Sequence, residues 1–254
     1  MRIDLNADLG EGFGPWAVGD DDAMLGIVTT ANVACGLHAG DPDTMRRTVE
    51  TARRNGVAIG AHPGFHDLIG FGRRLLPDAT PRKVENLVAY QVGALMGVAA
   101  LVGHPVTHVK THGALGNAAA DDDALADAVA RGIRAVDPRL AFMVMPGTAT
   151  ERAAGRAGLT PMREVYADRT YDDGFNLTGR SKPGAVIHDV EEACARVLAM
   201  VATNAITSVS GKRLTVGIDT VCVHGDNPAA VTMARTLRTR LEAAGRTVAP
   251  WTAG

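Results

Sequence analysis

Short β-forming runs alternate with helical segments along the chain, and this alternation restricts the fold more than any other feature of the sequence. Strands are expected at residues 3–8, 31–35, 57–62, 108–112, 141–145, 162–167 and 216–224. A hairpin around Gly211-Lys212 is one route into the last of them. Helices are expected at residues 44–54, 83–101, 121–136, 189–202 and 231–244. Strict alternation predicts a parallel sheet with right-handed crossovers, either open or closed into a barrel.

Three of the expected helices begin with the same signal. Asp41-Pro42, Thr80-Pro81 and Asn227-Pro228 each pair an N-cap residue with a proline at the first helical position. Gly56 and Gly245 follow two of these helices as stops. The helix boundaries therefore depend on local chemistry as well as on periodicity.

Four of the expected strands end at a histidine close to a glycine, and a fifth ending carries Asp8 and Glu11 instead. The carboxyl ends of parallel strands meet at one edge of a sheet, where α/β folds place their ligands. The pattern therefore predicts one shared site rather than unrelated turns. The four histidines, half of the eight in the chain, are His38, His62, His112 and His224.

The spread of these endings favours a ring of strands. An open sheet would gather functional loops at one switch point, whereas these endings follow the first, second, third, fourth and seventh expected strands. A chain of 254 residues suits a single α/β barrel, and no linker divides it. We expect a seven-stranded parallel (β/α) barrel, TIM-like, as one domain over residues 1–254. The sequence allows this barrel to be irregular or incompletely closed.

Charge and cysteine usage argue against several classes of partner. The 26 basic and 28 acidic residues are mixed along the chain and give a formal net charge of −2, so nucleic acid and anionic lipid are not expected partners. The apolar stretch at residues 92–103 is too short to span a membrane. Cys35, Cys194 and Cys222 include no CxxC pair, and no apolar export segment precedes the first strand. We therefore expect reduced thiols in a cytoplasmic protein.

The residue types at the strand endings suit acid–base and metal chemistry. Histidine can act as a general acid or base, bind a metal as neutral imidazole, or donate to a developing oxyanion. The carboxylates of Asp8 and Glu11 could hold Mg²⁺ or move protons. Lys110 precedes His112 by two residues, so both side chains are expected on one face of a strand. Taken singly, each histidine could belong to the core or to a turn, and both carboxylates to a solvated loop.

Anion-binding positions are expected in two turns and one long loop. Gly40-Asp41-Pro42 and Gly225-Asp226-Asn227-Pro228 form strand-to-helix turns that could receive a phosphate or a carboxylate. Asp41 would serve equally as a simple helix cap. Arg169 and Arg180 lie in a long glycine-containing segment, where arginine could clamp an anion. An ordinary exposed loop explains that segment equally well.

Two other patterns are weak. The run from Gly174 to Ser181 mimics a P-loop, but Pro183 follows closely and no helix opens where a P-loop needs one. His62 and His66 stand four residues apart, but the proline and glycine between them argue against a zinc-binding helix face. Any metal site would therefore draw on several strand ends.

Several long motifs, in order from Asp4 to Asp226, resemble the LamB/YcsF family. They are Asp4-Leu5-Asn6-Ala7-Asp8-Leu9-Gly10-Glu11-Gly12-Phe13-Gly14, Ala31-Asn32-Val33-Ala34-Cys35-Gly36-Leu37-His38-Ala39-Gly40-Asp41-Pro42, Ile59-Gly60-Ala61-His62-Pro63, Gly70-Phe71-Gly72-Arg73-Arg74 and Cys222-Val223-His224-Gly225-Asp226. The family's Lys-Pro-His-Gly-Ala-Leu-Tyr-Asn motif reads Lys110-Thr111-His112-Gly113-Ala114-Leu115-Gly116-Asn117 here. The family's proline before Arg180 is Gly179.

The resemblance implies a fold and a reaction. The fold is a seven-stranded (β/α) barrel. The reaction is the ATP-dependent opening of 5-oxoproline to glutamate, performed together with two further subunits, B and C. ATP is the implied nucleotide, and Mg²⁺ is a further candidate cofactor.

Residue roles follow from the same resemblance. Lys110 and Arg169 would bind phosphate or carboxylate, and Asp8 and Glu11 would hold a metal or a proton. The strand-end histidines would orient the substrate and exchange protons. A metal, if bound, would be held by Asp8, Glu11 or His62. The other candidates for binding substrate or phosphate are Asn6, Asn32, Asp41, Arg180 and Asp226.

Two other functions stay open at this point. A stand-alone metal-dependent amide hydrolase or deacetylase would use the same kinds of side chain. A non-catalytic subunit that only presents substrate to its partners is the second.

Overall fold

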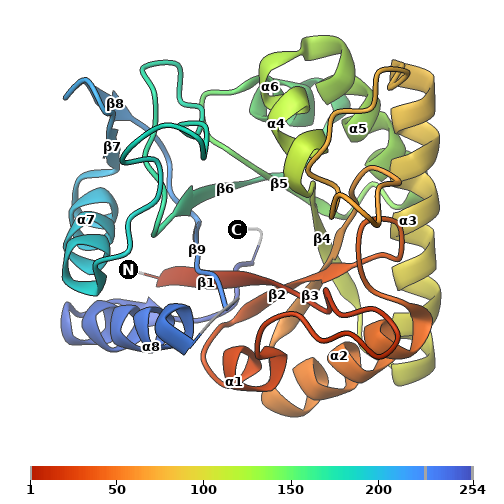
Figure 1. The fold of residues 1–254 in the computed structure, drawn as a ribbon, viewed down its shortest axis with the longest axis horizontal. Helices are drawn as coiled ribbons and strands as arrows, with labels where there is room; N and C mark the ends of the chain where they lie inside the picture. Colours follow the sequence, from red (N-terminus) through yellow and green to blue (C-terminus); the bar gives the residue numbers. More distant parts are fainter. Residues whose placement is uncertain (1, 226–227, 253–254) are drawn as a thin grey trace.

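Seven parallel strands form a closed barrel at the centre of the molecule (Figure 1). The computed structural model of the protein describes residues 2–252 except 226 and 227, and of Pro228 only the backbone. The barrel strands are β1 (Arg2–Leu9), β2 (Thr30–Ala34), β3 (Ala58–His62), β4 (Val106–Lys110), β5 (Ala141–Val144), β6 (Pro161–Tyr166) and β9 (Thr220–Cys222). Each pairs with the next, and pairing of β1 with β9 closes the ring. The predicted seven-stranded parallel barrel is confirmed, and it is closed.

Helices surround the barrel on its outer side (Figure 1). In the described part of the chain they are α1 (Asp21–Leu25), α2 (Pro42–Asn55), α3 (Pro81–Val102), α4 (Gly113–Asp121), α5 (Asp123–Val136), α6 (Ala149–Ala157), α7 (Val190–Thr203) and α8 (Pro228–Ala243). The sequence pattern missed α1, α4 and α6, which are short. It located the other five to within a few residues.

The expected last strand at residues 216–224 is wrong in its extent. Only β9 belongs to the barrel there, and it is preceded by an antiparallel hairpin of β7 (Ala205–Thr207) and β8 (Arg213–Thr215) outside the ring. The hairpin turns at Gly211, as expected. A further short strand, β10 (Thr247–Val248), pairs with the beginning of β1.

Local chemistry explains the helix ends. Asp41 accepts hydrogen bonds from the backbone N–H groups of Asp43 and Thr44, which caps α2, and Gly56 ends that helix in the left-handed region at φ 68°. Thr80 precedes Pro81 but makes no side-chain cap bond, so proline alone marks the start of α3. Asn227 lies outside the described residues.

α3 has an apolar length that could cross a membrane by length and composition. This differs from the expectation from residues 92–103 alone. One face of the helix, with Val88, Val92 and Leu95, is fully buried, and α3 packs against α5 and α2. A helix of the outer layer of a barrel needs such an apolar face.

The barrel interior is polar, which determines where chemistry can occur. Along β1, Ile3, Leu5, Ala7 and Leu9 join the apolar core under the helices, while the alternate residues point into the ring. Inside it, the Asp4 carboxylate accepts hydrogen bonds from the hydroxyls of Thr29, Thr30 and Thr220. Such buried polar groups are tolerated because they are hydrogen-bonded.

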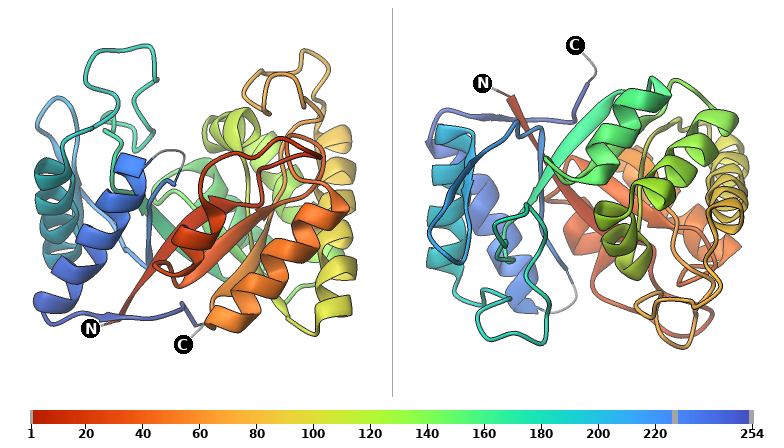
Figure 2. Two further views of the ribbon diagram at one scale, coloured as in Figure 1. Left: turned by 60° about the horizontal axis from the view of Figure 1, so that its bottom comes forward. Right: turned by 90° about the horizontal axis from the view of Figure 1, so that it is seen from above.

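The carboxyl ends of the strands form one mouth of the barrel. The loops after β3 and β6 rise at this end, opposite the beginning of β1 (Figure 2). Asp8, His62, Lys110 and Tyr166 all lie at or next to the last residue of a strand. The topology therefore gathers the predicted strand-end residues at one face.

Gly60 provides a test of the packing inside the barrel. A Cβ at this position would lie 2.2 Å from His108 Nε2, which is held by a hydrogen bond to Asn32 Oδ1 at 2.8 Å. Gly60→Ala should therefore lower the free energy of unfolding by about 1–3 kcal/mol, the usual cost of overpacking.

Gly93→Ala is the matched control, because Gly93 lies in α3 and a Cβ there would have no atom within 4 Å. Alanine there should raise stability by about 0.5–1 kcal/mol. Urea denaturation measures both, and equal stability of the two variants would contradict the packing described.

Candidate active site

A cavity of about 340 Å³ opens at the carboxyl ends of the barrel strands. Its size is at the lower end of the range for small-molecule sites. Strands contribute Asp8, Lys110, Glu164 and Tyr166, and loops contribute acidic and basic side chains from several directions. The charged residues and histidines that lie on its wall outside the strands are Glu11, Asp21, Arg73, His112, Arg169, Arg180 and His224.

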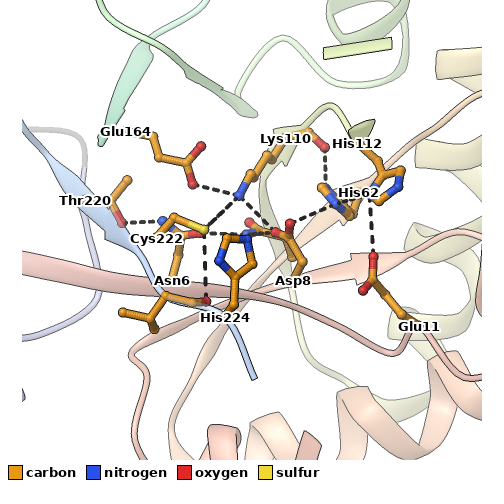
Figure 3. A network of polar contacts seen from close by, with 12 residues as sticks. Asn6, Asp8, Glu11, His62, Lys110, His112, Glu164, Thr220, Cys222 and His224 are labelled. Carbon is orange, nitrogen blue, oxygen red and sulfur yellow. Dashed lines mark hydrogen bonds and ion pairs between the residues drawn. The ribbon is translucent and has the colours of Figure 1, made fainter. Parts of the chain in front are cut away.

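The Lys110 ammonium group lies at the floor of the cavity between two carboxylates (Figure 3). Its Nζ is 2.9 Å from Asp8 Oδ1 and 2.7 Å from Glu164 Oε1. It also lies 3.4 Å from Cys222 Sγ and 5.1 Å above the centre of the Tyr166 ring. Burial by itself would lower the pKa of Lys110, but Asp8, Cys222 and Glu164 outweigh it and raise the pKa well above its usual range. The cavity therefore has a permanent positive charge in its floor.

Asp8 links this lysine to the histidines. Its Oδ1 accepts from Asn32 Nδ2 at 2.9 Å as well as from Lys110, and its Oδ2 is 3.3 Å from His62 Nε2. Burial would raise the pKa of Asp8, but the charges of His62 and Lys110 hold it well below the usual range. Asp8 therefore presents an ionised carboxylate on the cavity wall.

Asn6 and Asn32 do not line the cavity, so the lining gives no support to their expected role in binding substrate or phosphate. Both are fully buried in the ring. Asn6 donates to Thr220 and accepts from Asn32 at 2.8 Å. Their amides hold Asp8 and the floor of the site in place, since the strand register puts them one layer below the mouth.

His62 and His112 meet through their ring nitrogens. Figure 3 shows them beside Asp8 and Glu11. His62 Nδ1 donates to the Lys110 carbonyl at 2.9 Å, and His112 Nε2 donates to the Phe71 carbonyl at 2.8 Å. The other two nitrogens, His62 Nε2 and His112 Nδ1, are 3.0 Å apart. Two backbone carbonyls thus fix both rings and turn one nitrogen of each toward the other.

His38 stacks on His112 with ring centres 3.8 Å apart and an angle of 6° between the rings. It is fully buried, and neither of its nitrogens has a hydrogen-bond partner. Glu11 Oε1 lies 3.5 Å from His38 Nε2 and 3.5 Å from His112 Nδ1, and it too lacks a hydrogen-bond partner. Burial lowers the pKa of both His38 and His112 to about 3, and burial with the nearby Asp8 charge raises the pKa of Glu11.

His224 and Asp168 form an ion pair on the other side of the mouth. His224 Nδ1 is 2.8 Å from Asp168 Oδ2. Burial opposes the charged form of His224, but the hydrogen bond and charge of Asp168 raise its pKa above the usual value. Burial would raise the pKa of Asp168, and His224 reverses this effect and lowers it. The charged form of the His224 imidazole is therefore favoured on the cavity wall.

The long segment after β6 covers one side of the cavity. Arg169 is buried and donates to the carbonyls of Thr178 and Ala185. It also forms an isolated bridge with Val186, which folds residues 169–186 back on themselves. Arg169 and Arg180 both line the cavity, so the long glycine-containing segment brings both arginines to it.

The structure separates the other predicted residues. His38 and His62 contact His112 but lie beneath the cavity wall and do not line the cavity. Asp41 lies outside the cavity lining and caps α2, the alternative role that the sequence left open for it. Asp226 lies outside the described residues. The run from Gly174 to Ser181 leads into turns and not into a helix, as its weak P-loop pattern indicated.

Several residues of the site were missed in the sequence. Glu164 and Tyr166 are alternate residues of β6, so the period of two that placed Lys110 and His112 on one face would also have placed them there. Asp168 is a neighbour of the predicted Arg169. No local pattern marks Asp21, the first residue of α1, whose pKa is raised to about 6 by burial. Arg73 belongs to the motif Gly70-Phe71-Gly72-Arg73-Arg74 but was not named as a site residue, and it too lines the cavity.

Comparisons with known proteins agree with this architecture. The model of the LamB/YcsF family matches residues 3–254. The chain is 57% identical over 251 residues to a protein of Rhodopseudomonas palustris that is named as the A subunit of 5-oxoprolinase, covering 99% of each chain. The crystal structure of a lactam utilization protein from Thermus thermophilus matches with a TM-score of 0.92 and 43% identity, covering 98% of this chain and 99% of that one. The catalytic domain of a peptidoglycan N-acetylglucosamine deacetylase from Eubacterium rectale matches with a TM-score of 0.53 and 12% identity, covering 99% of this chain and 89% of that one, which shows the fold alone.

The His224–Asp168 pair should give a pH-dependent contribution to stability. A raised histidine pKa stabilises the fold below the unfolded value of about 6.5, and this contribution is lost as pH rises through the folded pKa. A lowered pKa of Asp168 stabilises the fold above the unfolded value of about 3.9, and this contribution is lost as pH falls through the folded pKa. His224→Gln should therefore cost about 1–3 kcal/mol of unfolding free energy near pH 5.5 and clearly less near pH 9.

Urea denaturation at both pH values measures this difference. His188→Gln is the control, because His188 is exposed and forms none of the ion pairs found among the described residues. A cost of His224→Gln that is the same at both pH values would contradict the charged pair.

Proposed function

The chain belongs to the LamB/YcsF family, and from that premise we propose that it is the A subunit of an ATP-dependent 5-oxoprolinase. The complex would open 5-oxoproline to glutamate while ATP is hydrolysed to ADP and phosphate. Relatives named as the A subunit of 5-oxoprolinase match over nearly the whole chain and support this function, as does a lactam utilization protein of closely similar fold. The word subunit in the names of these relatives supports further subunits as partners, and we propose that these are two, B and C.

The observation in the structure that carries the proposal is a small cavity with a buried ammonium in its floor and arginines on its wall. 5-Oxoproline combines a carboxylate with a lactam carbonyl. Arg169 and Arg180 are suited to the carboxylate, because guanidinium groups bind it through two hydrogen bonds. Lys110 would then face the lactam oxygen, where negative charge develops during the reaction.

The chemistry of the lactam explains the need for ATP. Resonance stabilises the C–N bond of an amide and slows attack by water. Transfer of the γ-phosphoryl group of ATP to the lactam oxygen would remove this resonance and create a phosphate leaving group. One water could then add to the ring carbon, and the C–N bond would break with a proton going to nitrogen, which leaves the side-chain carboxyl of glutamate as an acyl phosphate. A second water would displace phosphate from this acyl phosphate and form glutamate.

The side chains of the mouth suit the proton transfers of such a sequence. Asp8 has a lowered pKa, so its ionised carboxylate on the cavity wall can act as a base. On the opposite side, Asp168 raises the pKa of His224, which favours the proton-donating form of its imidazole.

We further propose that ATP, with its Mg²⁺, is brought to the mouth by a partner protein of the complex. The run from Gly174 to Ser181 mimics a P-loop only in letters, since turns follow it where a P-loop needs a helix. The cavity of about 340 Å³ is small for a nucleotide and a lactam together.

Three buried cysteines without a disulfide support a reducing, cytoplasmic setting for the protein.

A stand-alone amide hydrolase or deacetylase is not favoured. The deacetylase of similar fold is only 12% identical, whereas relatives named after the 5-oxoprolinase complex are more than half identical to the chain. A subunit that only presents substrate is also less suited to the site, because such a role does not require a buried lysine between two carboxylates.

Glutamate release should depend on the complete assembly. The isolated chain with 5-oxoproline should give little glutamate, with or without ATP. Adding the B and C subunits with ATP should produce glutamate and ADP in step, measured by amino-acid analysis and by a coupled ADP assay. Rapid release of glutamate by the isolated chain without ATP would contradict this function and support a simple hydrolase.

Lys110 should be required for turnover independently of its part in stability. Lys110→Met leaves Asp8 and Glu164 buried without their cation, which should cost about 3–5 kcal/mol of unfolding free energy. In the double variant Lys110→Met with Glu164→Gln, one of the two carboxylate charges is removed, so much of that stability should return. Turnover of the assembly should stay about tenfold to a thousandfold below the parent in both variants.

Glu164→Gln alone is the matched control, because it shows how the loss of the Glu164 charge affects turnover while Lys110 is still present. A double variant that folds stably and turns over at the rate of Glu164→Gln would remove Lys110 from the mechanism.

A further inference from the structure

Two histidine nitrogens face each other beneath the cavity wall. His62 Nε2 and His112 Nδ1 are 3.0 Å apart. The opposite nitrogen of each ring donates to a backbone carbonyl, Lys110 O for His62 and Phe71 O for His112. In neutral rings held this way, both facing nitrogens carry a lone pair. Two lone pairs at this distance repel, so the site needs a positive centre.

A proton between these two nitrogens would also serve Asp8 Oδ2, which is 3.3 Å from His62 Nε2, but it would leave His38 and Glu11 without a partner. His38 is fully buried, and both of its nitrogens lack a hydrogen-bond partner. Glu11 Oε1 is buried and lacks one as well, although it lies 3.5 Å from His38 Nε2 and from His112 Nδ1. Buried polar atoms without partners are costly and rare. A centre that accounts for all four side chains must accept four ligand atoms.

We propose that Glu11, His38, His62 and His112 together bind one divalent transition-metal ion, of the class that includes Zn²⁺ and Co²⁺. One ligand atom from each of the four lies within 4.8 Å of the others. Ligand distances to such ions are about 2.0–2.2 Å. An ion cannot lie in the planes of two stacked rings, so the His38 ring would tilt out of its stack on His112 to reach a shared ion. Three imidazoles with one carboxylate suit Zn²⁺ and Co²⁺, whereas Mg²⁺ prefers oxygen ligands.

The surroundings of the four side chains are those of a metal site. Metal-binding histidines usually donate their other N–H to a carbonyl or carboxylate, which fixes the ring, and both His62 and His112 do so here. Phe71, which supplies one of these carbonyls, has a φ of 54°, a conformation that L residues rarely adopt. Asp8 Oδ2, 3.3 Å from His62 Nε2, adds negative charge beside the site.

Two glycines hold the His38 ring in position. A Cβ at Gly64 would lie 2.6 Å from His38 Nδ1, and one at Gly72 would lie 2.7 Å from His38 Cβ. Gly72 also has a φ of 62°, so a side chain there would be strained as well as crowded. Backbone thus packs directly against the ring, and the histidine is fixed without any hydrogen bond of its own.

A second group of potential ligands is less suited to a metal. Asp8, Cys222 and His224 also have ligand atoms within 4.8 Å of one another. Their side chains are already engaged, since Asp8 and Cys222 accept from Lys110 and His224 pairs with Asp168. Of the two groups found among the described residues, only the first includes buried ligand atoms without a hydrogen-bond partner.

The site lies against the cavity, and this places an ion where it could meet a ligand. Glu11 and His112 line the cavity, while His38 and His62 lie behind them. An ion held by these four would therefore face the mouth on the side of Glu11. The metal site does not depend on the proposed lactam reaction, since metal binding can be measured without substrate.

Metal retention by the purified full chain tests the site. The chain would be treated with a chelator, dialysed, equilibrated with Zn²⁺, Co²⁺ or Mg²⁺ in turn, and passed through gel filtration. Plasma mass spectrometry should find one Zn²⁺ or Co²⁺ per chain and no retained Mg²⁺. The visible spectrum of the Co²⁺ form should show the ligand-field bands of a site with nitrogen donors.

Single substitutions assign the ligands. Glu11→Gln and His38→Gln should each weaken Zn²⁺ binding by at least about 100-fold in titration calorimetry, since loss even of an outer partner costs tenfold to 100-fold. His188→Gln, on an exposed residue, should bind as the parent does. Glu11 is partly exposed on a loop, so its variant is expected to fold, and circular dichroism checks this. Failure of the parent to retain Zn²⁺ or Co²⁺, or equal binding by Glu11→Gln and His188→Gln, would overturn the proposal.

Discussion

The rest of the site depends on one buried charge, the Lys110 ammonium between Asp8 and Glu164. A lysine with a few per cent of its surface exposed needs carboxylate partners, and the barrel supplies one from β1 and one from β6. Asp8 then pairs with His62, and Asn6 and Asn32 hold the floor beneath. A closed barrel makes this network feasible, because strands distant in sequence end around one axis.

The fold and the location of the site could be predicted from the sequence, for physical reasons. Capped helices between β-forming runs determine a parallel α/β topology, and closure follows from strand endings that are spread around the chain. His62, His112 and His224 are at the mouth because parallel strands end together. The short helices α1 and α6 had no comparable signal, and the last strand is shorter than its apolar run indicated.

The partners of each residue could not be predicted, because tertiary packing decides them. Asn6 and Asn32 share motifs with Asp8 and His38, yet they are turned inward and support other side chains. Glu164 pairs with Lys110 across the ring, and no local pattern connects residues 54 positions apart. The stacking of His38 on His112 likewise depends on Gly64 and Gly72, whose backbones pack against the rings. The two halves of the mouth therefore differ: arginines and His224 on one side suit anions and protons, and the histidine cluster on the other suits a cation.

A crystal structure of the chain with bound 5-oxoproline tests the central claim most directly, namely that the Lys110 cavity is the lactam site. The account predicts that the ligand lies in this cavity, with its carboxylate against Arg169 and Arg180 and its lactam oxygen within hydrogen-bonding distance of Lys110 Nζ. A ligand bound elsewhere on the chain, or in the cavity with its lactam oxygen turned away from Lys110, would contradict it.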